Sequence, residues 1–206
     1  MKSIKTLICA GLLALGVATS AKAAEGSLEV MCGDQTCAAD LKVSGSVAPG
    51  LGIFARQTTG IDYKNQVSPF GLVDLTYNVV DGVDVVAEGQ YSPGMGFMPR
   101  AGVQYFGQFG DFSVYALATT SLKEPMYGEV VANLRYQPAL TERLDGVVNV
   151  EDVTDFSKKG HDFSAQKVRV GVALDKKVEA GAAVNMSETG TAFDGANYGG
   201  YLLFRF

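Results

Sequence analysis

Apolar and polar residues alternate along most of this chain, in short segments that are separated by turn residues. In one such segment Val168, Val170 and Val172 fall on one face, whereas Lys167 and Arg169 fall on the other. Successive side chains of a β-strand point to opposite faces. The pattern therefore predicts strands with one apolar face and one polar face, and an all-β fold.

The alternation predicts about ten strands, near residues 41–56, 68–80, 83–92, 100–109, 112–122, 127–138, 146–154, 163–174, 178–187 and 197–206. Most are close to the roughly 9–11 residues that a tilted strand needs to cross a bilayer. The first is weak because it contains Pro49 and several glycines, and the seventh because Glu151 and Asp152 are adjacent. Eight or twelve strands are therefore also compatible with the pattern.

The connections between these strands alternate in length. Asp81–Gly82, Gly110–Asp111, 140–145 and 175–177 are short, and longer polar stretches separate them at 57–67, 93–99, 123–126, 155–162 and 188–196. Short turns on one rim and longer loops on the other are typical of outer-membrane barrels. We therefore favour a transmembrane antiparallel up-and-down β-barrel over a soluble sandwich, which gives the same alternation.

The N-terminus is typical of an export signal. Lys2 and Lys5 precede an apolar run over 7–18, and Ala21-Lys22-Ala23 fits a cleavage site. An apolar run of about a dozen residues is too short to span a bilayer as a helix. We expect residues 1–23 to be removed, which leaves 206 − 23 = 183 residues.

The C-terminal segment places Tyr198, Leu202, Phe204 and Phe206 on one face of a final strand. A terminal Phe on such a strand resembles the C-terminal signal of Gram-negative outer-membrane β-barrels, which their insertion machinery reads. Together with the export signal and the hairpin pattern, residues 41–206 resemble small porin-like outer-membrane barrels. The resemblance implies a multi-pass barrel in the cell outer membrane and leaves the activity open.

Charge and composition exclude several other classes of function. The formal net charge is −5, and removal of three signal lysines changes it to 14 − 22 = −8. An acidic chain with one His and no Lys/Arg cluster is not expected to bind nucleic acid. No glycine-rich phosphate loop or nucleotide motif is present, so we expect no cofactor. The expected partners are outer-membrane lipid and lipopolysaccharide, the barrel-assembly machinery, and small solutes or ions if the lumen is open.

Residues 24–40 precede the first expected strand and contain two cysteines. Cys32 and Cys37 enclose four residues, and a close even pair in an exported chain predicts a disulfide. A metal site would need two further ligands, and the only His is His161. We expect 24–40 to be an N-terminal periplasmic segment or a plug in the lumen, with an extra strand over Ser27–Met31 as the alternative.

The face opposite the apolar one carries charges of both signs and is expected to face the lumen. The main residues are Arg56, Asp74, Glu88, Glu129, Arg135, Lys167, Arg169, Glu179 and Arg205. About ten strands enclose little more than their own side chains. Such charges form either an ion-paired network that holds the barrel closed or the lining of a narrow polar conduit.

The segment around His161 contains the residue types of a hydrolase, because Ser164 follows three residues later. A lipid-active hydrolase would need a Ser, a His and a carboxylate within hydrogen-bond reach. Three residues apart on a regular strand, His161 and Ser164 would point to opposite faces, so we predict no catalytic residues and no metal. The leading hypothesis is a non-enzymatic barrel with a narrow or ion-paired lumen and a role in envelope structure or surface interaction. A small-solute or ion channel is the alternative, and a hydrolase using His161 comes third.

Overall fold

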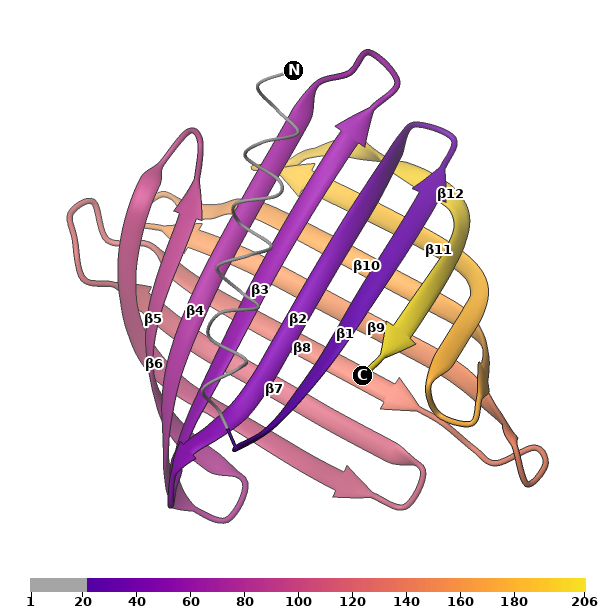
Figure 1. The fold of residues 1–206 in the computed structure, drawn as a ribbon. Coiled ribbons are helices and arrows are strands. Elements are labelled where there is room, and N and C mark those ends of the chain that lie inside the picture. Colours follow the sequence, from indigo (N-terminus) through magenta and orange to yellow (C-terminus); the bar gives the residue numbers. More distant parts are fainter. Residues whose placement is uncertain (1–21) are drawn as a thin grey trace.

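The computed structural model describes residues 22–206, which form a closed antiparallel barrel (Figure 1). Its strands are β1 (Lys22–Gly33), β2 (Thr36–Ala48), β3 (Leu51–Asp62), β4 (Val67–Val80), β5 (Val83–Ser92), β6 (Gly96–Phe109), β7 (Phe112–Ser121), β8 (Gly128–Tyr136), β9 (Leu144–Ser157), β10 (Gly160–Leu174), β11 (Val178–Thr189) and β12 (Ala192–Arg205). Nearly all of the expected export signal lies outside the described residues. The predicted all-β antiparallel barrel is confirmed.

The strand count is twelve within residues 22–206, so the main expectation of about ten is wrong. The expected strand over 41–56 is in fact the end of β2 and the start of β3, which meet at Pro49–Gly50. Proline has no N–H to donate to a sheet, and Gly50 has a φ of 73°, which favours glycine. The two residues that weakened the predicted strand therefore form a hairpin turn.

Residues 24–40 belong to the barrel wall, in β1 and the first part of β2. β1 pairs with β2 on one side and with β12 on the other, from Ser27↔Arg205 to Gly33↔Gly199. The expectation of a periplasmic segment or plug is therefore wrong, and the alternative of an extra strand describes this segment. The first and last strands together close the barrel.

Both rims carry short connections, which contradicts the expected alternation of short and long loops. Lys158–Lys159 alone separates β9 from β10, and residues 190–191 alone separate β11 from β12. The strands continue through segments that looked like polar loops, because inward residues such as Asp155 and Ser157 are polar up to the strand end. We call the rim where β1 begins and β12 ends the terminal rim.

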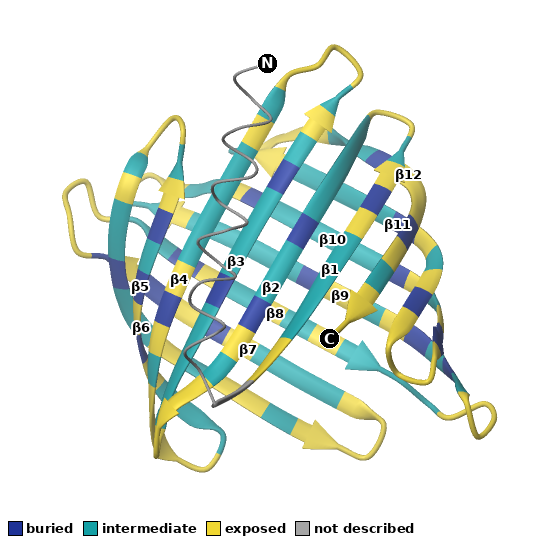
Figure 2. Ribbon diagram, viewed as in Figure 1, coloured by how far each residue is buried: buried dark blue, intermediate teal, exposed yellow. Residues whose placement is uncertain are grey.

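The barrel is apolar outside and polar inside, the reverse of a soluble protein. Buried and exposed residues alternate along many of its strands (Figure 2). Large apolar side chains stay exposed on the outer face of most strands, among them Leu75, Val85, Val103, Leu134, Val170 and Leu202. Charged side chains such as Asp74 and Glu179 are 2% and 1% exposed. A sheet face that is apolar all round is stable against lipid. No helix in residues 22–206 is long and apolar enough to cross a membrane.

The predicted disulfide between Cys32 and Cys37 is confirmed. The two residues are a cross-strand pair of β1 and β2, next to the turn at Asp34 and Gln35. Their exposed neighbours Val30 and Tyr198 lie on the outer face. The disulfide therefore links two residues that strand pairing already places opposite each other.

We expect the paired change Cys32→Ser and Cys37→Ser to lower the free energy of unfolding by about 2 kcal/mol, because a short loop restricts the unfolded chain only modestly. Urea unfolding of the refolded barrel, followed by the heat-dependent mobility shift on gels, measures the change. Failure of the double variant to form a barrel would show that the bridge is needed to register the hairpin.

Candidate functional site within the lumen

A cluster of ion pairs crosses the middle of the barrel. The Arg56 guanidinium Nη2, from β3, lies 2.5 Å from Asp40 Oδ2 of β2 and 2.8 Å from Glu151 Oε1 of β9. In the ring of strands, β3 and β9 are separated by five strands on either side. Arg56 and Glu151 therefore join opposite walls of the barrel, and we call this contact the lumen bridge.

Two lysines complete the cluster around the lumen bridge. Lys42 Nζ lies 3.2 Å from Glu151 Oε2, and Lys167 Nζ lies 3.1 Å from Asp40 Oδ2 and 3.5 Å from Glu151 Oε1. Both carboxylates have only 8% of their side chains exposed. Buried carboxylates are stable only when paired, and here three cations surround two of them.

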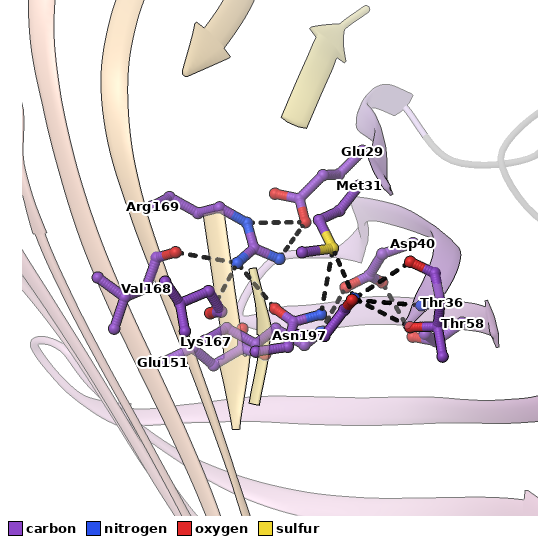
Figure 3. Close-up of polar contacts among 12 residues, drawn as sticks. Glu29, Met31, Thr36, Asp40, Thr58, Glu151, Lys167, Val168, Arg169 and Asn197 are labelled. Atoms are coloured by element: carbon purple, nitrogen blue, oxygen red, sulfur yellow. Dashed lines mark hydrogen bonds and ion pairs between the residues drawn. The ribbon is translucent and has the colours of Figure 1, made fainter. Parts of the chain in front are cut away.

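A second cluster links β1 to β10 and β11 (Figure 3). Arg169 donates from Nη2 to Glu29 Oε1 at 2.7 Å and from Nη1 to Asn185 Oδ1 at 2.8 Å. The guanidinium also lies 5.7 Å from the centre of the Tyr201 ring, within the range of a cation–π contact. A small apolar core of Met31, Ala183 and Tyr201 packs beside it. This cluster stabilises the part of the wall where the two ends of the chain meet.

A third cluster lies near the terminal rim and is centred on Glu179, which is 1% exposed. Arg205 Nη2 donates to Glu179 Oε1 at 2.6 Å, and Arg135 donates to the same oxygen. Arg135 also contacts Gln137 at 2.8 Å, and Gln137 donates to Asp145 at 2.8 Å. One carboxylate thus joins β8, β11 and β12.

The opposite half of the lumen is acidic. Asp74 pairs across strands with Glu88, and Glu129 pairs with Asp155. Arg100 Nε lies 3.2 Å from Glu88 Oε1. Gln90 donates to both oxygens of Glu129 at 3.0 Å. Oxygen atoms of three of these acids are buried without a hydrogen-bond partner: Asp74, Glu88 and Asp155. Within residues 22–206, no group of three or more metal-ligating side chains is arranged to hold an ion.

Each of the nine residues expected to face the lumen either makes a polar contact in the interior or is buried there: Arg56, Asp74, Glu88, Glu129, Arg135, Lys167, Arg169, Glu179 and Arg205. Sequence reasoning missed Glu29 and Asp40, because residues 24–40 were expected to form a periplasmic segment or plug. It also missed Lys42, in the weak expected strand 41–56, and Glu151, next to Asp152 in a segment that alternates poorly. Asp40, Lys42 and Ser44 are polar at every second position, and this pattern could have assigned Asp40 and Lys42 to the inner face of a strand.

His161 lies on the outer side of the wall, edge-on to the ring of Phe156. A β-bulge follows it, so His161 pairs with Phe156 while Ser164 pairs with Thr154. Phe156 and Thr154 share a face, and the expectation that His161 and Ser164 point to opposite faces is therefore wrong. His161 Nδ1 contacts the carbonyl oxygen of Gly190 at 2.5 Å, and no hydrogen bond joins His161 to Ser164 in the described part of the chain.

The residues of the expected insertion signal line the outer face of β12 and the chain end. Tyr198, Leu202, Phe204 and Phe206 are all exposed. Phe206 exchanges two backbone hydrogen bonds with Gly26, and a Cβ at Gly26 would overlap the Phe206 ring. The terminal residue is thus part of the closed wall, and its role in insertion stays a prediction.

No protein-family model matches the chain, and no curated protein sequence does. The chain is similar in structure to the KdgM porin in complex with disordered oligogalacturonate, with a TM-score of 0.54, 11% identity, and coverage of 88% of this chain and 99% of KdgM. The NanC porin matches with a TM-score of 0.55 and 9% identity, over 89% of this chain and 98% of NanC. LpxR from Salmonella typhimurium matches with a TM-score of 0.51 and 9% identity, over 87% of this chain and 99% of LpxR.

Identities this low establish the fold alone. The predicted resemblance to small porin-like outer-membrane barrels is confirmed at the level of the fold. Together with the apolar outer face, this fold supports the prediction of a multi-pass β-barrel in the outer membrane.

Proposed function

We propose that this chain is a non-enzymatic, porin-like barrel of the outer membrane whose lumen is closed at rest by ion pairs. The observation that supports this most directly is the lumen bridge, in which Arg56 contacts Glu151 on the opposite wall at 2.8 Å. Two side chains that meet from opposite walls occupy the path a solute would take.

Two further contacts strengthen the closure. Glu29 pairs with Arg169, and Arg135 pairs with Glu179, each across a gap of two intervening strands. A passing solute would have to separate buried charges, and removing one partner of a buried pair costs about 3–5 kcal/mol. We therefore infer that the barrel acts through envelope structure or surface contacts, with lipid and lipopolysaccharide around its apolar face and the assembly machinery at β12.

A narrow channel is the second candidate, and one observation favours it. The fold is that of porins, one of which was solved with oligogalacturonate, and charged rings control ion selectivity in other pores. In that case the lumen bridge would be the constriction of a conduit for ions or small solutes.

A lipid-active hydrolase is the weakest candidate. His161 and Ser164 share a face, but the Nδ1 atom of His161 contacts a backbone carbonyl group and no hydrogen bond joins the pair. A deletion strain with unchanged outer-membrane lipids supports the non-enzymatic proposal, and an altered acyl pattern restored by wild type but not by His161→Ala contradicts it.

Single-channel recording distinguishes the first two functions. The mature barrel is refolded in detergent, its folding is checked by the heat-dependent gel shift, and it is inserted into a planar bilayer. We expect long silent recordings, because the lumen bridge closes the path. Reproducible conductance steps from the wild-type barrel, with an ion selectivity altered by Arg56→Gln, would establish the channel instead.

A further inference from the structure

A cavity of about 460 Å³ opens at the terminal rim, where β12 ends beside β1. Its polar lining is formed by Glu25, Ser27, Lys42, Ser44, Lys177 and Arg205. Its volume falls within the roughly 300–1,000 Å³ of typical small-molecule sites. The cavity lies apart from the lumen bridge, although Lys42 contributes to both.

Strand register explains why these side chains meet. Ser27 of β1 is paired with Arg205 of β12 on one side and with Lys42 of β2 on the other. Cross-strand partners share a face of the sheet, so Arg205, Ser27 and Lys42 form a row along one rung of the wall. The carbonyl oxygen of Lys177 accepts a hydrogen bond from the Arg205 N–H at 2.8 Å, which holds the β10–β11 turn beside this row.

The cavity carries more positive than negative charge. Three cations line it, Lys42, Lys177 and Arg205, against the single acidic side chain of Glu25. Arg205 uses Nε and Nη2 for Glu179, and none of the hydrogen bonds of the described residues involves its Nη1. Lys177 makes no ion pair in residues 22–206. Donors of two cations therefore remain free at the rim.

The chain end also lines this cavity. Phe206 exchanges two backbone hydrogen bonds with Gly26, and none of the ion pairs of residues 22–206 involves Phe206. Phe206 therefore occupies no donor of the cations that line the cavity.

We propose that this cavity binds a small anion that carries carboxylate or phosphate groups. A guanidinium matches the paired oxygens of either group, an ammonium supplies a point charge, and the Ser27 and Ser44 hydroxyls can donate to the remaining oxygens. The proposal does not depend on whether the lumen conducts, because the cavity opens to the terminal rim.

Isothermal titration calorimetry of the refolded mature barrel tests this proposal, with citrate and inorganic phosphate as separate probes at constant ionic strength in chloride buffer. We expect one site per chain for at least one probe. Binding of citrate alone identifies a carboxylate site, and binding of phosphate alone identifies a phosphate site. Absence of binding for both probes contradicts the proposal.

Three variants locate the site. We expect Lys177→Gln to weaken binding about fivefold, because one charge contact near solvent is lost, and Glu25→Gln to strengthen it by a similar factor, because a repulsion is removed. Lys176→Gln is the matched control: it removes the same charge from the adjacent position of the same turn, which lines a different cavity. Equal losses for Lys176→Gln and Lys177→Gln would show non-specific attraction and contradict the proposal. If Lys177→Gln does not fold, as judged by the heat-dependent gel shift, the affinity of Glu25→Gln tests the proposal. Tighter binding supports it, and unchanged or weaker binding contradicts it.

Discussion

The Glu151→Ala barrel is expected to be less stable than wild type by about 3–5 kcal/mol, the usual loss when one partner of a buried ion pair is removed. Glu151 receives Arg56, Lys42 and Lys167 within 3.5 Å. Its removal leaves three cations with the single carboxylate of Asp40. The substitution also detaches β9 from β3, so we expect conductance steps that wild type lacks.

Urea unfolding in lipid vesicles, read by the heat-dependent gel shift, measures the loss of stability. Glu142→Ala is the control, because Glu142 is exposed in the connection at 137–143 and makes no ion pair in the described residues. Two results would contradict the role of the lumen bridge: wild-type stability of Glu151→Ala, or equal losses for the two variants. A Glu151→Ala barrel that is less stable but shows no conductance steps would mean that other contacts close the lumen.

The Gly181→Ala variant is expected to lose about 3 kcal/mol or more, at or above the upper end of the usual cost of overpacking a core. An added Cβ at Gly181 would overlap the carbonyl oxygen of Val170 and the Cα of Gly171, its cross-strand partner. Both contacts are with backbone, which a side-chain rotation cannot relieve. β10 and β11 would therefore have to separate.

Gly60→Ala provides the matched comparison, because a Cβ at Gly60 in β3 has nothing within 4 Å. We expect that variant to fold with wild-type stability, measured in the same unfolding assay. A similar loss for both glycines would mean that the effect comes from backbone flexibility rather than from the close approach of β10 and β11.

Local patterns predicted the strand type, the polar interior and the disulfide. Each depends on neighbours in sequence: the alternation around Val170, for example, or the spacing of Cys32 and Cys37. The strand count failed where a turn of two residues, Pro49–Gly50, lay within one alternating segment. The bulge after His161 was also missed, because an extra residue in one strand leaves no mark in periodicity.

The candidate site itself could not be predicted from the sequence. Arg56 and Glu151 are 95 residues apart, and their contact follows from the closure of the ring with twelve strands. With ten strands the same two residues would not lie on opposite walls. Alternation along a strand thus determines which residues face inward. Strand number and register determine which of these residues meet across the lumen.

Closure of the ring by β1 and β12 also sets the order of biogenesis. β1 is the first of the twelve strands to be synthesised, and one of its two neighbours, β12, is the last of them. Until then β1 has a free edge, which pairs readily with other chains. Closure of the ring must therefore follow the synthesis of β12, and the exported chain needs protection from aggregation for the whole of that interval.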